Sequence, residues 1–244
     1  MFLAVSSERM HEITAEEIAR LVPAIDYSEA LTIAASEEDV RAACRAAGKY
    51  RFRAVVAFPQ YLGILVDELQ GSGVRAQIPV AFPCGGTTTH VKCLEAEEGL
   101  RRGATDLDMV MNIAAFKAGE YARVAWDIGE VMAVAKPFQV PFKVIIEIGV
   151  LTEAEKVTAA KLVLDSGADF IKTCTGFGPG RATVHDIGLI RETVGAALGI
   201  KASGGVASIE DAVALMRAGA TVVAMRRFLL DQLEGLGWPA SAAS

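Results

Sequence analysis

The stretch GADFIKTCTG, residues 167–176, contains the pattern that decides the fold. Its first glycine can end a helix in a left-handed conformation, and the short apolar run that follows has the length of a buried strand. Related stretches begin at Gly103 and Gly219, where GAT leads into DLDMVM and VVAM. The three glycines are 64 and 52 residues apart, about two strand-and-helix units each time. This spacing predicts repeated βα units and a parallel sheet.

Eight strands are expected outward from this stretch, near residues 22–26, 53–58, 77–82, 106–111, 142–148, 170–173, 200–202 and 222–225. Helix starts are indicated at Thr14, Thr152 and Ser208, because each hydroxyl is followed three residues later by an acid. The Thr14 signal predicts an extra helix before the first strand.

Eight units without an internal linker favour a closed (β/α)8 barrel, a TIM barrel of the α/β class, over an open doubly wound sheet. No G-x-G-x-x-G motif follows the first strand, which argues against a dinucleotide-binding sheet. We expect one domain over residues 1–235 and a flexible tail over 236–244.

Composition excludes several classes of protein. The 244 residues are 52% hydrophobic and 22% charged, and 30 acids outnumber 24 lysines and arginines. Disorder and sequence-independent nucleic-acid binding are therefore disfavoured. Four cysteines without C-x-x-C spacing and three scattered histidines predict neither a metal site nor a cofactor. The apolar start of the chain is too short for a signal peptide, and no run reaches about 20 apolar residues, so we expect a cytoplasmic protein without a membrane span.

Three of the charged residues within the predicted buried strands stand out. Asp108, Lys172 and Lys201 fall on the fourth, sixth and seventh strands, and inward-facing side chains there meet at the C-terminal mouth, where barrel enzymes build their sites. A second ammonium nearby disfavours protonation of the first, which makes one lysine an amine nucleophile and indicates Schiff-base chemistry. The structural alternative is that each lysine reaches solvent at a strand end or pairs with a surface acid.

Five motifs in order carry a resemblance to a known family: FPCGGTTT at 82–89, DLDMVMN at 106–112, FKVIIE at 142–147, GADFIKTCTGFG at 167–178 and IKASGGV at 200–206. The chain, from about Ile18 to Ala220, resembles deoxyribose-phosphate aldolase. These class I aldolases cleave 2-deoxyribose 5-phosphate to acetaldehyde and glyceraldehyde 3-phosphate without a metal. The resemblance implies that Lys172 forms the imine, that Lys201 perturbs it electrostatically and that Asp108 supports proton transfer through water.

The resemblance also implies a phosphate site, and here the sequence departs from the family. Gly204 and Gly205 remain, and Thr173 and Gly176 complete the expected substrate-binding set. The Gly-Thr-Ser turn that usually follows the last strand is replaced by residues 224–228, AMRRF. Two arginines in the first turn of a helix oppose its dipole unless an anion compensates. Arg226 and Arg227 are thus predicted either to clamp a phosphate or carboxylate or to be solvated or interface residues.

Other departures make the expected pocket more apolar. Leu31 replaces a lysine of the family pattern, Phe58 lies where Asn or Tyr is usual, and Ile148 replaces a threonine. Cys174 replaces a serine and is interpreted as a small filler. Lys143, on the fifth strand with Glu147, is expected to be a polar partner within the barrel.

The favoured function is a metal-independent class I aldolase acting on deoxyribose 5-phosphate or a similar sugar, as a homodimer or larger homo-oligomer. Two alternatives stay open. One is a related imine-forming lyase or transferase acting on a non-phosphorylated or carboxylated carbonyl compound. The other is a relative that keeps the barrel and binds a ligand without turnover.

Overall fold

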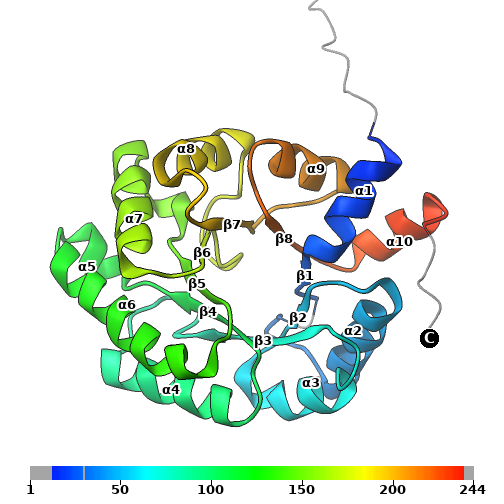
Figure 1. Cartoon of the computed structure of the whole chain (residues 1–244), viewed down its shortest axis with the longest axis horizontal. Coiled ribbons are helices and arrows are strands. Elements are labelled where there is room, and N and C mark those ends of the chain that lie inside the picture. The colour runs from blue at the N-terminus through cyan, green and yellow to red at the C-terminus, as the bar shows by residue number, and fades with distance from the viewer. Residues whose placement is uncertain (1–12, 30, 239–244) are drawn as a thin grey trace, which may run out of the picture.

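Eight parallel strands close into a barrel, each pairing with its neighbours in chain order and β8 returning to β1 (Figure 1). The computed structural model describes residues 13–29 and 31–238. The strands are β1 Ile25–Tyr27, β2 Ala54–Val56, β3 Arg75–Val80, β4 Asp106–Val110, β5 Phe142–Ile145, β6 Phe170–Lys172, β7 Gly199–Ala202 and β8 Val222–Met225. The predicted TIM barrel and its eight strands are confirmed.

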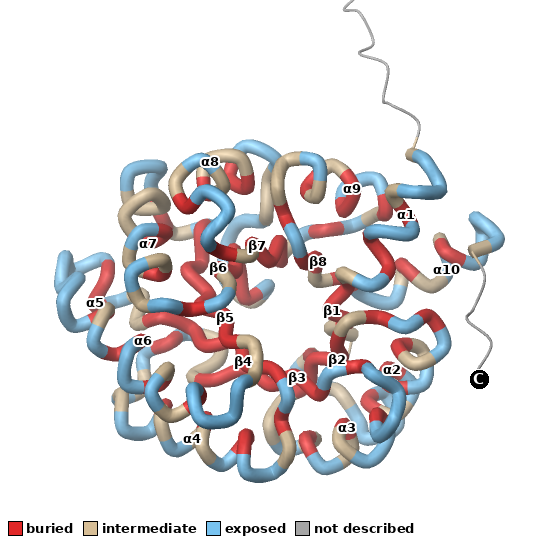
Figure 2. The backbone as a smooth tube through the Cα atoms, in the orientation of Figure 1, coloured by how far each residue is buried: buried red, intermediate tan, exposed pale blue. Residues whose placement is uncertain are grey.

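Helices surround the barrel and present their buried sides to it, as the burial colouring of Figure 2 shows. They are α1 Ala15–Leu21, α2 Glu37–Tyr50, α3 Leu62–Glu68, α4 Thr89–Arg101, α5 Ile113–Lys117, α6 Tyr121–Ala135, α7 Glu153–Ser166, α8 Val184–Val194, α9 Ile209–Arg217 and α10 Phe228–Gly235. Four 3-10 turns are interspersed, η1 Val22–Ala24, η2 Pro59–Tyr61, η3 Lys136–Phe138 and η4 Ile148–Val150. None of the helices in the described ranges is long and apolar enough to cross a membrane.

The helix signals read from the sequence have their expected geometry. Thr14 and Thr152 form complete capping boxes with Glu17 and Glu155, and the Ser208 hydroxyl accepts from the N–H of Asp211. These contacts satisfy backbone donors that a helix start leaves unpaired. The extra N-terminal helix α1 packs beside α9, where Arg217 donates to Glu17.

Four strands differ from their predicted ranges by two residues or more. The second ends at Val56 instead of residue 58, and the third runs two residues earlier than 77–82. The first and fifth differ for identifiable reasons. Pro23 lies in the 3-10 turn η1, so the chain enters β1 at Ile25 rather than Val22. Strand β5 ends at Ile145, and Glu147 takes a left-handed conformation with φ 53°. The sequence stays apolar across the start of β1 and the end of β5. The local backbone conformation, and not a change in hydrophobicity, therefore limits the pairing of these strands.

The predicted flexible tail lies largely outside the described residues, which end at Trp238. Within the described part, Leu236 is the C-cap of α10, and Trp238 is partly buried and packs against the core.

Gly85, in the loop after β3, is predicted to be required for the fold. Its φ is +67°, and a Cβ there would lie 1.9 Å from the carbonyl oxygen of Met111, just after β4. Gly85→Ala should therefore lower the free energy of unfolding by about 2 kcal/mol or more, because the clash is with backbone. Gly86→Ala is the matched control, since nothing lies within 4 Å of its added Cβ. Equal denaturation midpoints for the two variants would contradict this reading.

Candidate active site

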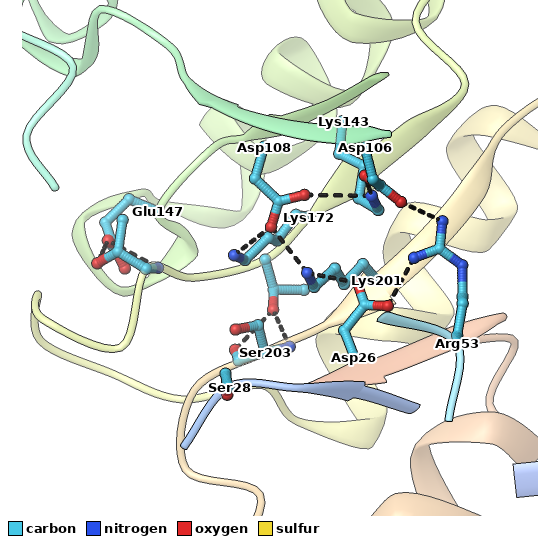
Figure 3. A network of polar contacts seen from close by, with 12 residues as sticks. Asp26, Ser28, Arg53, Asp106, Asp108, Lys143, Glu147, Lys172, Lys201 and Ser203 are labelled. Carbon is cyan, nitrogen blue, oxygen red and sulfur yellow. Dashed lines mark hydrogen bonds and ion pairs between the residues drawn. The ribbon is translucent and has the colours of Figure 1, made fainter. Parts of the chain in front are cut away.

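Strand register places two lysines side by side in the barrel interior. Lys172 on β6 is the direct neighbour of Lys201 on β7, so both side chains point to the same face of the sheet. Asp108 reaches them from β4, and its Oδ2 lies 2.6 Å from Nζ of Lys172 and 2.7 Å from Nζ of Lys201. The structure thus brings together the three residues that the sequence singled out, as Figure 3 shows.

A cavity of about 280 Å³ opens above this cluster at the C-terminal ends of the strands. Lys172 and Lys201 form part of its wall, whereas Asp108 is fully buried beneath them. A larger groove of about 760 Å³ lies at the other end of the barrel, where Phe142 and Phe170 begin β5 and β6. The smaller cavity is the candidate active site because it alone of these two reaches the lysines.

Four more charged residues take part in the interior network and were not assigned a site role from the sequence: Asp26 on β1, Arg53 before β2, Asp106 on β4 and Lys143 on β5. The signal for Asp106 was available, because it lies two residues before Asp108 and therefore faces the same side of the strand. Lys143 is a polar partner in the barrel as expected, but it binds Asp106 and Asp108 rather than Glu147.

The network shifts the pKa values of its members in different directions. Burial raises the pKa of Asp106 in spite of Lys143 and Arg53. Burial opposes the ionised form of Asp108, but Lys172, Lys201 and Lys143 outweigh it and hold the pKa of this carboxyl well below its ordinary range. Burial also disfavours the charged form of Lys201, yet Asp108 and Asp26 together raise the pKa of its ammonium. Lys201 therefore stays protonated.

Lys172 behaves differently from Lys201. Burial, with a smaller contribution from Lys201, lowers the pKa of Lys172 to about 8, although Asp108 acts in the opposite direction. The sequence reasoning named the neighbouring ammonium as the cause, and removal from water is the larger one. Roughly a tenth of Lys172 is then uncharged at pH 7, on the order of two hundred times the fraction for a free lysine. Such an amine can act as a nucleophile.

The loop after β6 is held by Glu147. Its Oε2 accepts from the backbone N–H of Thr175 at 3.1 Å and from the Thr175 hydroxyl. The Thr175 hydroxyl oxygen in turn accepts from the N–H groups of Phe177 and Gly178, at 3.0 and 3.3 Å. Thr175 and Gly176 line the cavity. Glu147 thus fixes the wall beside Lys172 and was not predicted to do so.

Thr173 does not line the cavity. Its hydroxyl donates to the carbonyl of Ser203 at 2.8 Å and accepts from the same residue's N–H at 2.9 Å. This side chain joins the end of β6 to the end of β7 and is fully buried. We therefore assign Thr173 a structural role in place of the predicted contact with substrate.

Three of the four predicted anion-binding residues line the cavity, and the fourth, Arg227, does not. Gly204, Gly205 and Arg226 line the cavity. Arg227 is the N-cap of α10, and its backbone N–H donates to Glu29 at 2.9 Å. The helix begins at Phe228, so both arginines precede its first turn instead of lying within it. The helix dipole therefore opposes the charges of the two arginines less directly than their predicted place in the first turn implied.

Two of the glycines that line the cavity, Gly204 and Gly205, occupy positions that exclude a side chain. Gly204 has φ +91°, and a Cβ there would come within 2.8 Å of Cβ of Cys174. Gly205 has φ +68° and would meet Arg181. Burial raises the pKa of the Cys174 thiol to about 12, which keeps it protonated and supports its interpretation as a filler.

Of the three apolar replacements expected at the pocket, only Leu31 lines the cavity. Val56 also lines the cavity. Phe58 packs edge-on against Phe82 and Phe177, with ring centroids 6.1 and 6.4 Å apart. Ile148 is buried and is not part of the cavity wall.

Comparison with known proteins identifies the family of the chain. Residues 20–230 match the family model described as DeoC/LacD family aldolase. The deoxyribose-phosphate aldolase of Caldanaerobacter subterraneus subsp. tengcongensis is 40% identical over 206 residues, which cover 84% of this chain and 89% of that protein. That of Bacillus cereus is 44% identical over 188 residues, covering 77% and 84%.

Solved structures give the same result. Deoxyribose phosphate aldolase from Aeropyrum pernix, described as having a unique tetrameric structure, superposes with a TM-score of 0.82. It is 28% identical, and the match covers 91% of this chain and 96% of that one. The barrel and its relatives define an aldolase, a carbon–carbon lyase. More narrowly, the chain belongs to the DeoC/LacD family of aldolases.

The amine of Lys172 should titrate with a midpoint near 8, the value to which its pKa is lowered. Trace acetylation across pH 6–10, followed by mass spectrometry of the Lys172 peptide, measures this midpoint without requiring turnover. Lys161, exposed on α7, provides the reference for reagent reactivity. Lys201→Met removes a positive charge and should move the midpoint upward. An unshifted midpoint in that variant would exclude Lys201 as a contributor.

Proposed function

We propose that this protein is a class I aldolase in which Lys172 forms a Schiff base with the substrate carbonyl. One observation carries the proposal: Lys172 faces the cavity with a single carboxylate partner, whereas Lys143 and Lys201 each contact two. Of these three lysines inside the barrel, Lys172 is therefore the one whose charge is least compensated. A lysine must lose its proton before it can attack a carbonyl carbon.

The proposed reaction cleaves 2-deoxyribose 5-phosphate. The Lys172 nitrogen adds to the aldehyde carbon, and loss of water gives a protonated imine. A base removes the proton of the 3-hydroxyl, the C2–C3 bond breaks, and its electrons move into the imine to form an enamine. Glyceraldehyde 3-phosphate leaves at this point. Protonation of the enamine carbon and hydrolysis then release acetaldehyde and restore Lys172.

We assign supporting roles to the two partners of Lys172. Lys201 remains charged and disfavours a second positive charge at Lys172, which promotes the neutral amine. Asp108 remains ionised and holds both nitrogens at one oxygen. Because its pKa is so low, Asp108 is a weak base by itself, and we propose that it supports proton transfer by orienting water beside the reacting atoms.

The far end of the substrate is assigned to the anion-binding side of the cavity. Gly204, Gly205 and Arg226 lie there, and a guanidinium binds phosphate or carboxylate through paired hydrogen bonds. Arg226 in place of a glycine-serine turn favours a second candidate as well, an imine-forming lyase or transferase acting on a carboxylated carbonyl compound. The apolar Leu31 and Val56 beside it suit a substrate with fewer hydroxyl groups.

The Schiff base is tested by reductive trapping. Sodium borohydride added with deoxyribose 5-phosphate should leave a covalent adduct on Lys172, located by peptide mass spectrometry. Lys172→Met should abolish both the adduct and cleavage, whereas Lys161→Met, a substitution of an exposed lysine on α7, should affect neither. An adduct on Lys201 or no adduct with any aldehyde or ketone would refute the assignment.

Arg226→Ala is expected to raise KM for the phosphorylated sugar by about 10-fold or more, because a charge-assisted hydrogen bond is lost. The KM for unphosphorylated deoxyribose should change little. Arg227→Ala is the matched control and should leave both KM values unchanged, since Arg227 does not line the cavity. If activity is instead found with a carboxylated aldehyde and depends on Arg226, the second candidate replaces the first.

We further propose that the enzyme works as a homo-oligomer in the cytoplasm. The tetrameric description of the Aeropyrum relative supports the first part. The four free cysteines, two of them buried, fit a reducing compartment.

A further inference from the structure

Six interior side chains form a closed cycle of alternating charge, which we name the charge ring. In order around the cycle they are Arg53, Asp26, Lys201, Asp108, Lys143 and Asp106. The separations that close it include 2.5 Å from Arg53 to Asp26 and 2.7 Å from Arg53 to Asp106. Figure 3 shows the ring with Lys172 attached to it through Asp108.

The charge ring is electrically balanced when all six of its members are ionised. Three carboxylates alternate with three cations, and all are fully buried except Arg53, whose side chain is 9% exposed. Lys172 is a seventh charged group and has no carboxylate of its own. If Lys172 is protonated, the interior has an uncompensated positive charge, which is unfavourable away from water. If Lys172 is neutral, the interior charges cancel.

Arg53 closes the ring at the end away from the cavity. Its guanidinium donates to Asp26 through one nitrogen and to Asp106 through another, a bridge that the planar fork of an arginine can make. The Phe170 ring lies 5.4 Å from this guanidinium and 5.5 Å from Nζ of Lys143. Arg53 contacts neither Lys172 nor the cavity wall, so any influence on the reaction is indirect.

We propose that Arg53 and Asp106 are positioning residues for the nucleophile: by closing a neutral ring beneath it, they make Lys172 the group of the interior that releases its proton. The proposal rests on the proposed function only in calling Lys172 the nucleophile. It predicts that the proton affinity of Lys172 follows the net charge of the ring.

The groups that face Lys172 come from several strands. Asp108 contacts it from β4, Lys201 is its neighbour on β7, and Asp26 on β1 acts over a longer range and favours its charged form. Lys143 on β5 contacts the other oxygen of Asp108. Arg226 is the one charged residue, besides the two lysines, among the described residues that line the cavity. Glu147, at the end of β5, is held by Thr175.

The test changes the charge of the ring at constant shape. Asp106→Asn leaves the ring with one excess positive charge, so the titration midpoint of Lys172, measured by trace acetylation, should fall by about half a pH unit or more. Adding Arg53→Gln to that variant restores neutrality and should return the midpoint to the wild-type value. Glu97→Gln with Arg101→Gln, which removes an exposed ion pair on α4, should leave the midpoint unchanged.

Asp26→Asn provides the same test at the other carboxylate partner of Arg53. It serves as the test variant if Asp106→Asn does not fold. The acid limb of the kcat/KM profile should move with the acetylation midpoint. If the single and double variants share the wild-type midpoint, the ring does not control Lys172 and the proposal is overturned. If the midpoints shift as expected but borohydride traps no imine, the ring is upheld and the aldolase mechanism fails.

Discussion

One carboxylate oxygen, Oδ2 of Asp108, binds two lysine nitrogens, and the rest of the interior depends on that shared contact. Two ammonium groups so close together would repel each other without it. A single carboxylate compensates one positive charge in full and a second only in part. Loss of the proton from the second lysine therefore stabilises the interior. Because Lys201 has Asp26 as a further partner, the one that loses it is Lys172.

The barrel supplies the distances that this contact requires. Lys172 and Lys201 are register neighbours on adjacent strands, while Asp108 crosses the interior from β4. Such an arrangement needs a closed sheet, because strands that lie far apart in an open sheet would not share an interior. The buried layer between strands and helices, filled by side chains such as Ile171, Val144 and Val223, keeps the strands in register.

The fold could be predicted because its signals are local. Capping hydroxyls at Thr14, Thr152 and Ser208 and glycines that end helices mark the repeat without knowledge of the partners. Strand boundaries were less predictable, since Pro23 delays the start of β1 and the left-handed Glu147 follows the end of β5, both inside apolar stretches.

The candidate site was predictable where charge interrupts a buried strand. Lys172, Lys201 and Asp108 carry that signal. Arg53, the first residue of the predicted second strand, reads as a strand-end residue that reaches solvent until Asp26 of β1 and Asp106 of β4 are placed next to it. Glu147 and Thr173 illustrate the same limit, since their partners lie across a loop or on the neighbouring strand. Pairings over long sequence separations are not encoded in any one segment.

Phe170 packs beneath the charged residues at the end of the barrel away from the cavity. Its ring lies under Arg53 and Lys143 and fits there because residue 199 is glycine, where a Cβ would come within 2.1 Å of the ring. At the opposite end, Lys172 forms part of the cavity wall and is 2% exposed. A molecule bound in that cavity would therefore cover the amine and shield it from exchange with bulk solvent.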